Sequence, residues 1–260
     1  MKYIIPKIIG VVHLLPLPGA PKSGVQFSEI LDRAADDCKS YYDNMVNCAI
    51  IENFGDAPFT GGKVPPITIS SMTLVACELR RQFPEMHFGI DVLRNDAEAA
   101  LSIAEAVGAE FIRVNVHVGA VVADQGIIQG TAYETLRLRK NLNSSVKIFA
   151  DIGVKHSVQL GNYNVNLQAA DALERGLADA IIITGARTGT PIDLRELQTL
   201  RKDFPEAKII VGSGAKVNNL KKLLKYADSI IVGTSIKVDG ITTNPVDGKR
   251  VREFVNSALS

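Results

Sequence analysis

Short apolar runs recur along the chain, and each ends in a polar residue or is followed by glycine. The runs are Ile8–His13, Ala49–Glu52, Phe88–Asp91, Phe111–His117, Lys147–Ile152, Ala180–Thr184, Ile209–Val211 and Ile230–Val232. Continuously apolar runs of this length are typical of parallel strands that are buried on both faces. The pattern therefore predicts eight parallel strands.

Helix signals lie between these runs. Capping-box spacing is found for Asn95 with Glu98, Thr131 with Glu134, and Asp193 with Glu196, while Gly108 and Gly176 stand where helices should end. The apolar positions of the final segment, Val251, Phe254, Val255 and Ala258, follow the helical stripe of an inward-packed face. Strand and helix therefore alternate through the whole chain.

Eight such alternations predict an α/β fold, a single (β/α)₈ TIM barrel over residues 1–260. The length agrees with the roughly 250 residues that are usual for one such barrel. An open doubly wound sheet is the alternative. A dinucleotide-binding sheet would carry G-x-G-x-x-G after its first strand, whereas Gly10 lies inside the run and no such motif follows, so the barrel is favoured.

Composition narrows the classes of partner. The chain has 29 basic and 28 acidic residues and a formal net charge of +1, which argues against nucleic acid or a membrane surface. Its three cysteines form no C-x-x-C pair, which favours the reducing cytoplasm, and no apolar run reaches transmembrane length. Lys2 and Lys7 before Ile8–Leu17 also resemble a signal peptide, but the β-branched residues of this run favour a strand.

Alternation along a strand tells which side chains point into the barrel. In the fourth run the polar residues share one face and the apolar residues the other, so the polar face should look inward. The same count places polar side chains at the inward, C-terminal ends of the other strands. The residues so placed are Arg113, Asn115 and His117 in the fourth run, and His13, Glu52, Asp91, Asp151 and Thr184 in the others.

A buried, unpaired charge costs several kcal/mol, so these carboxylates must be paired, solvated at the mouth, or used in chemistry. An ion pair with Arg113 or Lys155 would be enough to explain the presence of any single one of these carboxylates. For the set as a whole an active site is the better interpretation, because catalytic residues of TIM barrels lie at this face.

Glycine-rich turns follow the last two strands. Backbone N–H groups there can approach an anion closely, and the phosphate site of a TIM barrel is frequently built from these two loops. Ordinary tight turns are the alternative interpretation. The residues predicted to bind a substrate phosphate are Gly212, Ser213, Gly214, Gly233, Thr234 and Ser235, with Thr184 and Gly185 from the preceding loop. Lys237 is either a fixed positive charge for this site or an exposed lysine.

Three connections are longer than a barrel requires: His13–Phe27, Asn53–Pro65 and Val118–Gly130, the last with Asp124 and Gln125. All three follow the C-terminal ends of strands, where long loops are usually functional. They are therefore expected to cover the mouth of the barrel.

These residues and motifs resemble the BtpA/SgcQ family of TIM-barrel proteins. The resemblance spans nearly the whole chain and rests on Ile9–Gly19, Glu52–Phe59, Leu93–Asp96, Phe111–Val116, Asp124–Gly126, Asp151–His156, Thr184–Gly185, Val211–Gly214 and Val232–Ser235. It implies the barrel fold and, for different members, either biogenesis of a membrane complex such as photosystem I or sugar metabolism. It supplies no catalytic residues, so the chemistry depends on the residues themselves.

The first functional hypothesis is an enzyme acting on a small phosphorylated metabolite of the sugar phosphate type. Glu52, Asp91 and Asp151 would transfer protons, as in isomerases, epimerases and aldolases, while Arg113, Asn115 and His13 stabilise an oxyanion. Lys155 would form a Schiff base or act electrostatically. A variant is metal-assisted hydrolysis with a divalent ion bound by candidates Glu52, Asp91, His117 and Asp151.

The second hypothesis is a non-catalytic factor for the assembly or stability of a membrane complex. Such a factor would carry an exposed apolar patch, and Tyr41 and Tyr42 are candidates for residues of this patch. The sequence leaves open the substrate, the need for a metal and a homo-oligomeric state.

Overall fold

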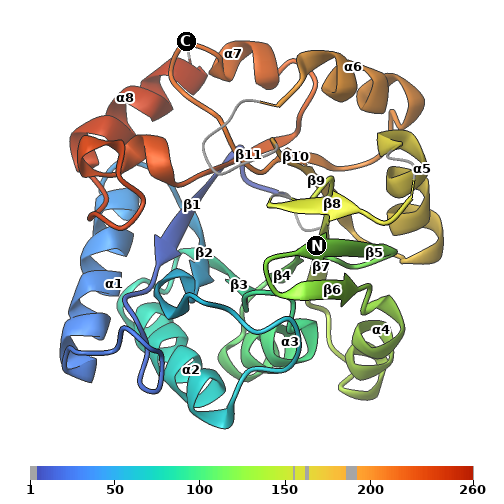
Figure 1. The fold of residues 1–260 in the computed structure, drawn as a ribbon. Coiled ribbons are helices and arrows are strands. Elements are labelled where there is room, and N and C mark those ends of the chain that lie inside the picture. The colour runs from blue at the N-terminus through green and yellow to red at the C-terminus, as the bar shows by residue number, and fades with distance from the viewer. Residues whose placement is uncertain (1–4, 155, 162–163, 186–191, 260) are drawn as a thin grey trace.

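The predicted barrel is confirmed. The computed structural model describes residues 5–154, 156–161, 164–185 and 192–259, and its main sheet is a closed barrel of eight parallel strands (Figure 1). The strands are β1 (Ile8–His13), β2 (Cys48–Glu52), β3 (His87–Asp91), β4 (Phe111–Val114), β7 (Lys147–Ile152), β9 (Ala180–Ile183), β10 (Ile209–Val211) and β11 (Ser229–Val232). They follow the barrel in chain order, as repeated right-handed crossovers require.

Helices surround the barrel (Figure 1). They are α1 (Phe27–Tyr42), α2 (Pro66–Gln82), α3 (Ala97–Val107), α4 (Ala132–Asn141), α5 (Val165–Ala170), α6 (Leu194–Asp203), α7 (Leu220–Leu223) and α8 (Gly248–Leu259). A π-helical segment, η2 (Asp171–Arg175), continues α5, and 3₁₀ turns form η1 (Phe54–Asp56), η3 (Thr234–Ile236) and η4 (Val238–Gly240).

The helix ends match the predicted signals in part. Gly108 caps α3 in the left-handed region at φ 68°, a conformation in which a glycine carries no Cβ penalty. Asp193 caps α6 through its side chain, whereas the Thr131 side chain makes no capping hydrogen bond to the backbone of α4. The prediction for Asn95 is off by one residue, because the carboxylate of Asp96 caps α3 and Asn95 instead bonds the backbone of Val116.

The barrel closes where β1 pairs with β11, with Ile8 opposite Ile230 and Gly10 opposite Val232. On its other side β1 pairs with β2. The strand interpretation of Ile8–His13 is therefore confirmed.

Side chains alternate along the strands as predicted. An inner layer of apolar side chains fills the barrel towards the N-terminal ends of the strands, and the rings of Phe111 and Phe149 stack there with centroids 4.4 Å apart. The intervening positions, such as Ile51, Ile90 and Ile112, pack outwards in the large cluster formed with the helices. Because the inner layer is apolar, the inward polar residues are confined to the C-terminal ends of the strands.

A small antiparallel sheet, which the strand pattern did not predict, lies in front of the barrel mouth (Figure 1). It contains β5 (Ala120–Ala123), β6 (Gly126–Gln129) and β8 (Ser157–Gln159). The predicted loop Val118–Gly130 is thus largely a β-hairpin. Val121 and Ile128 face inwards and pack with Val116 and Val154, which fixes the sheet on the barrel.

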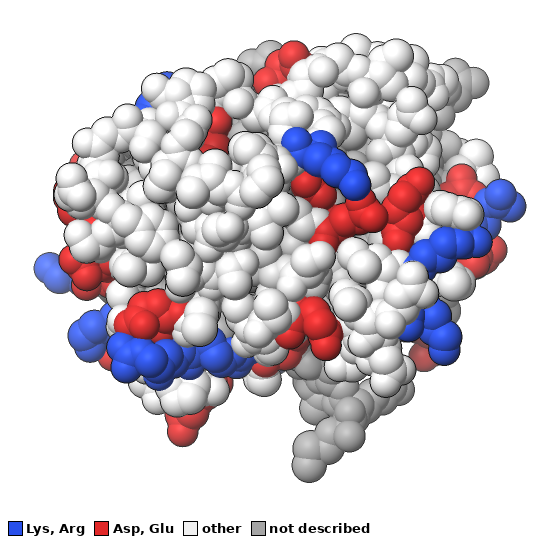
Figure 2. Space-filling model, turned by 90° about the horizontal axis from the view of Figure 1, so that it is seen from below, with Lys and Arg blue, Asp and Glu red and all other residues white. Residues whose placement is uncertain are grey.

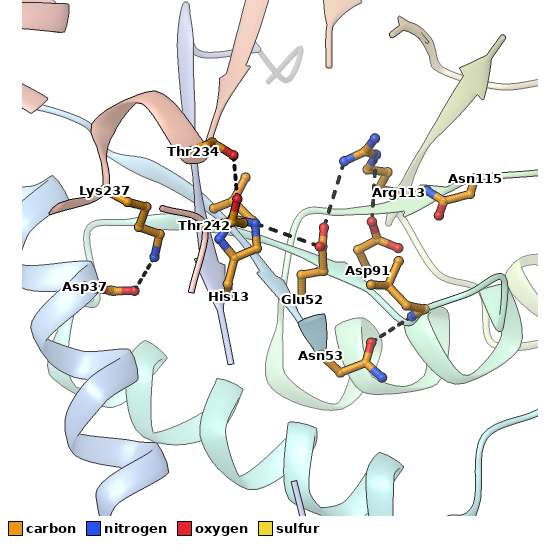
Figure 3. Close-up of polar contacts among 12 residues, drawn as sticks. His13, Asp37, Glu52, Asn53, Asp91, Arg113, Asn115, Thr234, Lys237 and Thr242 are labelled. Atoms are coloured by element: carbon orange, nitrogen blue, oxygen red, sulfur yellow. Dashed lines mark hydrogen bonds and ion pairs between the residues drawn. The ribbon is translucent and has the colours of Figure 1, made fainter. Parts of the chain in front are cut away.

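The two interpretations of Lys237, a fixed charge for the anion site and an exposed lysine, are both wrong. Its side chain is fully buried, and its Nζ donates to Oδ2 of Asp37 on α1 at 2.7 Å (Figure 3). Burial lowers the pKa of Lys237, and the Asp37 carboxylate opposes that shift. Asp37 Oδ1 also accepts from the backbone N–H of Val246, so one carboxylate holds both ends of the 237–246 loop.

Within the described ranges, no helix has both the length and the apolar character that a bilayer crossing requires.

Candidate active site

Three carboxylates from three strands meet one guanidinium at the C-terminal end of the barrel. Glu52 ends β2, Asp91 ends β3 and Asp151 lies near the end of β7, while Arg113 comes from β4. Arg113 forms a bidentate pair with Asp151, with Nε and Nη2 at 2.9 and 2.8 Å from the two carboxylate oxygens. Its Nε lies 3.7 Å from Asp91 Oδ2, and its Nη1 lies 4.0 Å from Glu52 Oε2 (Figure 3).

The cluster is nearly sealed from solvent: Arg113 is 6% exposed, Asp91 2%, and Glu52 and Asp151 7% each. Burial, together with the nearby charge of Glu52, raises the pKa of Asp91 well above its ordinary value, and Arg113 only partly opposes this. For Arg113, burial opposes the charged form, but the Asp151 carboxylate outweighs it and the pKa is raised. The guanidinium is therefore always charged, whereas Asp91 favours its neutral form.

Other predicted residues border this cluster. His13 ends β1, and its Nε2 lies 3.9 Å from Glu52 Oε1, with its ring 4.8 Å from that of Phe54 (Figure 3). Asn115 donates to Asp151 at 3.4 Å and accepts from Arg94 at 3.2 Å. Both therefore lie where the sequence placed them, beside the carboxylates.

The glycine turns after β10 and β11 line a cavity of about 920 Å³, which we call the glycine-loop pocket. Gly212, Ser213, Gly214, Gly233, Thr234 and Ser235 all line it. The backbone N–H groups of Gly214 and Thr234 donate to no residue that the structure describes. Lys216, Lys249 and Arg250 also line this pocket.

Close packing explains the glycines here. A Cβ at Gly233 would lie 2.8 Å from Cε1 of His13, and one at Gly212 would lie 2.5 Å from Cγ2 of Ile182. Gly214 adopts φ 72°, which L side chains rarely adopt.

A second cavity of about 700 Å³, the carboxylate pocket, lies beside the first. It is lined by Asp91, Asp151 and Asn115, and by Asp124 and Gln125 from the β5–β6 turn. Glu52, Phe54 and Arg113 line both pockets. A molecule held in one pocket therefore meets the same three side chains as a molecule held in the other.

Some predicted residues lie elsewhere. His117 was predicted to point inwards, but β4 ends at Val114, so the alternation stops before it. Its Nε2 donates to the carbonyl oxygen of Gly176 at 2.7 Å, and burial lowers its pKa. Tyr41 is fully buried and bonds Val11, so it belongs to no exposed patch.

Thr184 and Gly185, which follow β9, bond neighbouring loops of the site. The Thr184 hydroxyl donates to the carbonyl oxygen of Gly153, and the Gly185 N–H donates to the Ser213 hydroxyl, so both brace neighbouring loops without lining the glycine-loop pocket. Lys155 falls outside the described residues. His156 is exposed and lines the carboxylate pocket.

Sequence reasoning missed several residues that line the pockets, among them Lys216, Lys249 and Arg250 of the glycine-loop pocket. Arg94 follows Asp91 by three positions and Phe54 follows Glu52 by two, so their closeness to strand ends was a usable signal. Thr242 lies far along the chain, and its hydroxyl bonds that of Thr234 at 2.9 Å (Figure 3). The contacts of Asp37 with Lys237 and Val246, and of Arg33 with Thr243, hold its loop against α1, and no local sequence pattern predicts them.

The proposed metal ligands do not form a metal site. Among the described residues no group of three or more His, Cys, Asp or Glu could hold a metal ion. The guanidinium of Arg113 stands within 4.0 Å of all three carboxylates, where a cation would have to bind. His117 is directed to Gly176 instead.

Comparison with known proteins gives one family. A model described as the BtpA family matches residues 5–260. An uncharacterized protein of Methanocaldococcus jannaschii is 45% identical over 96% of this chain and 94% of its own length. The Photosystem I biogenesis protein BtpA of Synechocystis is 42% identical over 96% of this chain and 87% of its own length.

Solved structures support the fold alone. One described as "Native KDPGal structure" has a TM-score of 0.61 at 10% identity and covers 100% of this chain and 97% of its own. The phosphoribosyl anthranilate isomerase of Thermus thermophilus has a TM-score of 0.57 at 9% identity, with 98% of each chain covered.

Proposed function

This chain belongs to the BtpA family, and from that premise we propose that it is an enzyme acting on a small phosphorylated metabolite of the sugar phosphate type. The observation that carries the proposal is the sharing of Glu52, Phe54 and Arg113 by the two pockets. A phosphate held by the glycine turns would leave the rest of its molecule against the strand-end carboxylates.

The phosphate would bind in the glycine-loop pocket. The N–H groups of Gly214 and Thr234 supply donors that no described residue uses. Lys216, Lys249 and Arg250 bring positive charge to a lining that also holds Asp247 and Glu253. Backbone donors suit a phosphate because they cost no side-chain ordering and sit where glycine allows close approach.

The carboxyl groups would divide the acid and base roles. The bidentate pair with Arg113 engages both carboxylate oxygens of Asp151. Asp91, with its raised pKa, retains a proton and can donate it. Glu52 lines both pockets, and its ion-pair distances to the described residues His13 and Arg113 are long, at 3.9 and 4.0 Å, so it is best placed to accept one.

Such a pair suits proton transfer at a carbon next to a carbonyl group, as in isomerases, epimerases and aldolases. Proton transfer by positioned groups typically contributes about 10²- to 10⁴-fold. The Arg113 guanidinium and Asn115 amide would stabilise the negative oxygen that develops on the substrate. Among TIM barrels of similar shape, the phosphoribosyl anthranilate isomerase carries an isomerase name, which supports the proposal by analogy only.

A second candidate function is assembly of a membrane complex, as the name of the Synechocystis relative states for that protein. The observation that favours it is a row of exposed apolar residues across the small sheet. Ile127, Val122 and Val158 lie directly opposite one another, and they are 61%, 41% and 72% exposed. Ile67 and Leu74 of α2 are exposed as well, and the face of the molecule seen from below includes a broad area without charged side chains (Figure 2).

A thermal shift measurement tests the proposed function. Purified protein is heated with inorganic phosphate, with ribose 5-phosphate or fructose 6-phosphate, and with the unphosphorylated sugars as controls. A sugar phosphate at 100 times its Kd should add about 2.7 kcal/mol of stability, which raises the Tm of a domain this size by roughly 5–10 °C. Gly214→Ala should lose the shift.

Absence of a shift with every phosphorylated compound would contradict the proposal. If a sugar phosphate shifts Tm but Gly214→Ala responds as wild type does, the phosphate lies elsewhere. A Glu52→Gln variant that keeps the shift but loses proton exchange of the bound compound with deuterated water would support the assigned roles.

A further inference from the structure

Acids predominate among the charged residues that line the carboxylate pocket. In the carboxylate pocket the described lining residues include the acids Glu52, Asp91, Asp124 and Asp151 against the guanidiniums of Arg94 and Arg113. Arg113 is already matched by its bidentate pair with Asp151, so the remaining acids outnumber the remaining base.

The acids also have a defined order in space. Asp91 is 2% exposed and lines the carboxylate pocket, and its Oδ2 makes no hydrogen bond with any described residue; its contact with Arg113 Nε is 3.7 Å long. Asp124 stands at the turn of the β5–β6 hairpin, on the solvent side of the same pocket. A ligand thus meets one carboxylate at the entrance and an unsatisfied carboxyl oxygen in the interior.

Resting on the proposed function, we infer that the substrate is a monophosphate whose remote end is an uncharged hydroxylated group, and that the carboxylate pocket rejects a second phosphate or carboxylate. Sugar hydroxyls can both donate to and accept from a buried carboxyl group, which would satisfy Asp91 Oδ2. A second anion would instead face Glu52 and Asp124. The guanidiniums among the described lining residues are Arg113, which is paired with Asp151, and Arg94, whose Nη1 donates to Asn115. Asp124 is thereby assigned as a specificity-determining residue outside the proton-transfer groups.

Matched pairs of compounds test this inference. Fructose 6-phosphate is compared with fructose 1,6-bisphosphate, and glucose 6-phosphate with 6-phosphogluconate, by isothermal titration calorimetry. Like charges a few ångströms apart repel each other, so in each pair the compound with the uncharged end should bind roughly 10-fold more tightly, or better. Because screening weakens repulsion between partly exposed charges, the ratio should shrink as salt is added.

Variants locate the source of the discrimination. Asp124→Asn should reduce the ratio about threefold or more, mainly by strengthening the binding of the doubly charged compound. Asp43→Asn serves as the matched control, because Asp43 is an exposed acid paired with Lys39 at the end of α1 and lines neither pocket. It should leave the ratio unchanged. Asp124 lies in an exposed turn, so its variant should fold, and the salt titration of wild type gives an independent measurement.

The outcomes separate the two proposals. If monophosphates bind but the bisphosphate or the phosphogluconate binds equally or more tightly, this inference is wrong while the proposed function stands. A ratio that salt and Asp124→Asn both leave unchanged also overturns it. If no phosphorylated compound binds, the proposed function itself has failed, and this inference falls with it.

Discussion

At the scale of single residues, two buried carboxyl groups of the site differ in how well their oxygens are hydrogen-bonded. Asp151 neutralises the buried Arg113 guanidinium through two short hydrogen bonds, whereas Asp91 is buried without a hydrogen bond to Oδ2 among the described residues. Removing one partner of a buried ion pair is costly because the other charge is left unpaired. Replacing Asp91, which favours its neutral form, leaves no such charge behind. The two residues should therefore respond to substitution in opposite directions.

We predict that Asp151→Asn lowers the free energy of unfolding by about 3–5 kcal/mol, because it leaves the Arg113 charge buried without its bidentate partner. Asp91→Asn at neutral pH should be at least as stable as wild type. Urea denaturation of both variants measures the difference. If both variants lose the same free energy of unfolding, the Asp91 carboxyl group is stabilised by the fold as strongly as that of Asp151, which would contradict the prediction.

A pH dependence follows from Asp91. Its folded-state pKa is raised, first by burial and then by the charge of Glu52. The folded protein therefore keeps this proton where the unfolded chain has lost it, so the stabilising contribution is complete below the unfolded pKa of about 3.9 and is lost as pH rises towards the folded value.

Wild type should accordingly lose stability relative to Asp91→Asn as pH rises above about 4, by up to about 1.4 kcal/mol per pH unit while only the folded state holds the proton. Paired urea titrations from about pH 4 to about pH 8 measure this difference. Parallel stability curves for the two proteins would contradict it.

The alternation of side chains predicted most of this cluster. Glu52, Asp91, Arg113 and Asp151 converge because strand parity is a local property that the barrel preserves. It failed for His117, where the strand ends early and the ring bonds Gly176. No single-residue pattern tells where a strand stops when Val114 and Val116 continue the apolar alternation.

At the scale of elements, the buried pair of Asp37 and Lys237 joins α1 to the 237–246 loop, which carries Thr242 into the site. The sequence did not reveal it, because 200 residues separate the partners and each alone resembles an ordinary surface residue. Similarly, Val118–Gly130 was predicted as a loop because its strands are only four residues long each.

We predict that Asp37→Asn costs about 3–5 kcal/mol, because Lys237 then keeps a buried charge without an anion. Asp43→Asn, which breaks the exposed pair with Lys39 on the same helix, should cost no more than about 0.5 kcal/mol. Adding Lys237→Met to Asp37→Asn should recover most of the loss. Chemical denaturation checks all three variants, and a double variant no more stable than Asp37→Asn would show that the pair is not the cause.

At the scale of the whole molecule, the fold was predictable because every repeat carries the same signal. Eight buried strands in series leave few topologies, and a short-looped parallel arrangement of this size closes into a barrel. The glycine turns were found because their place after the last two strands follows from that topology. The function was less predictable, since both pockets and the exposed apolar row are products of tertiary packing.

The two candidate functions depend on separate surfaces of the molecule, which allows a last prediction. Replacing Val122, Ile127 and Val158 together by Thr retains β-propensity on the exposed face of the small sheet, whose buried face is held by Val121 and Ile128. Stability should change by no more than about 0.5 kcal/mol per site. The thermal shift produced by a sugar phosphate should be unchanged, because none of the three residues lines either pocket.

If this chain restores a Synechocystis strain that lacks its own BtpA, complementation by variants separates the two candidate functions. If the proposed enzyme activity accounts for the rescue, the triple Thr variant should restore the strain and Gly214→Ala should not, because only the latter alters the glycine turn after β10, where φ is 72°. The reverse result would assign the biological role to the apolar row and leave the pocket dispensable. The triple Thr variant alters the exposed apolar row and Gly214→Ala alters the glycine turn. If neither variant restores the strain, both features are needed, which would indicate that assembly of the complex requires the protein with its ligand bound.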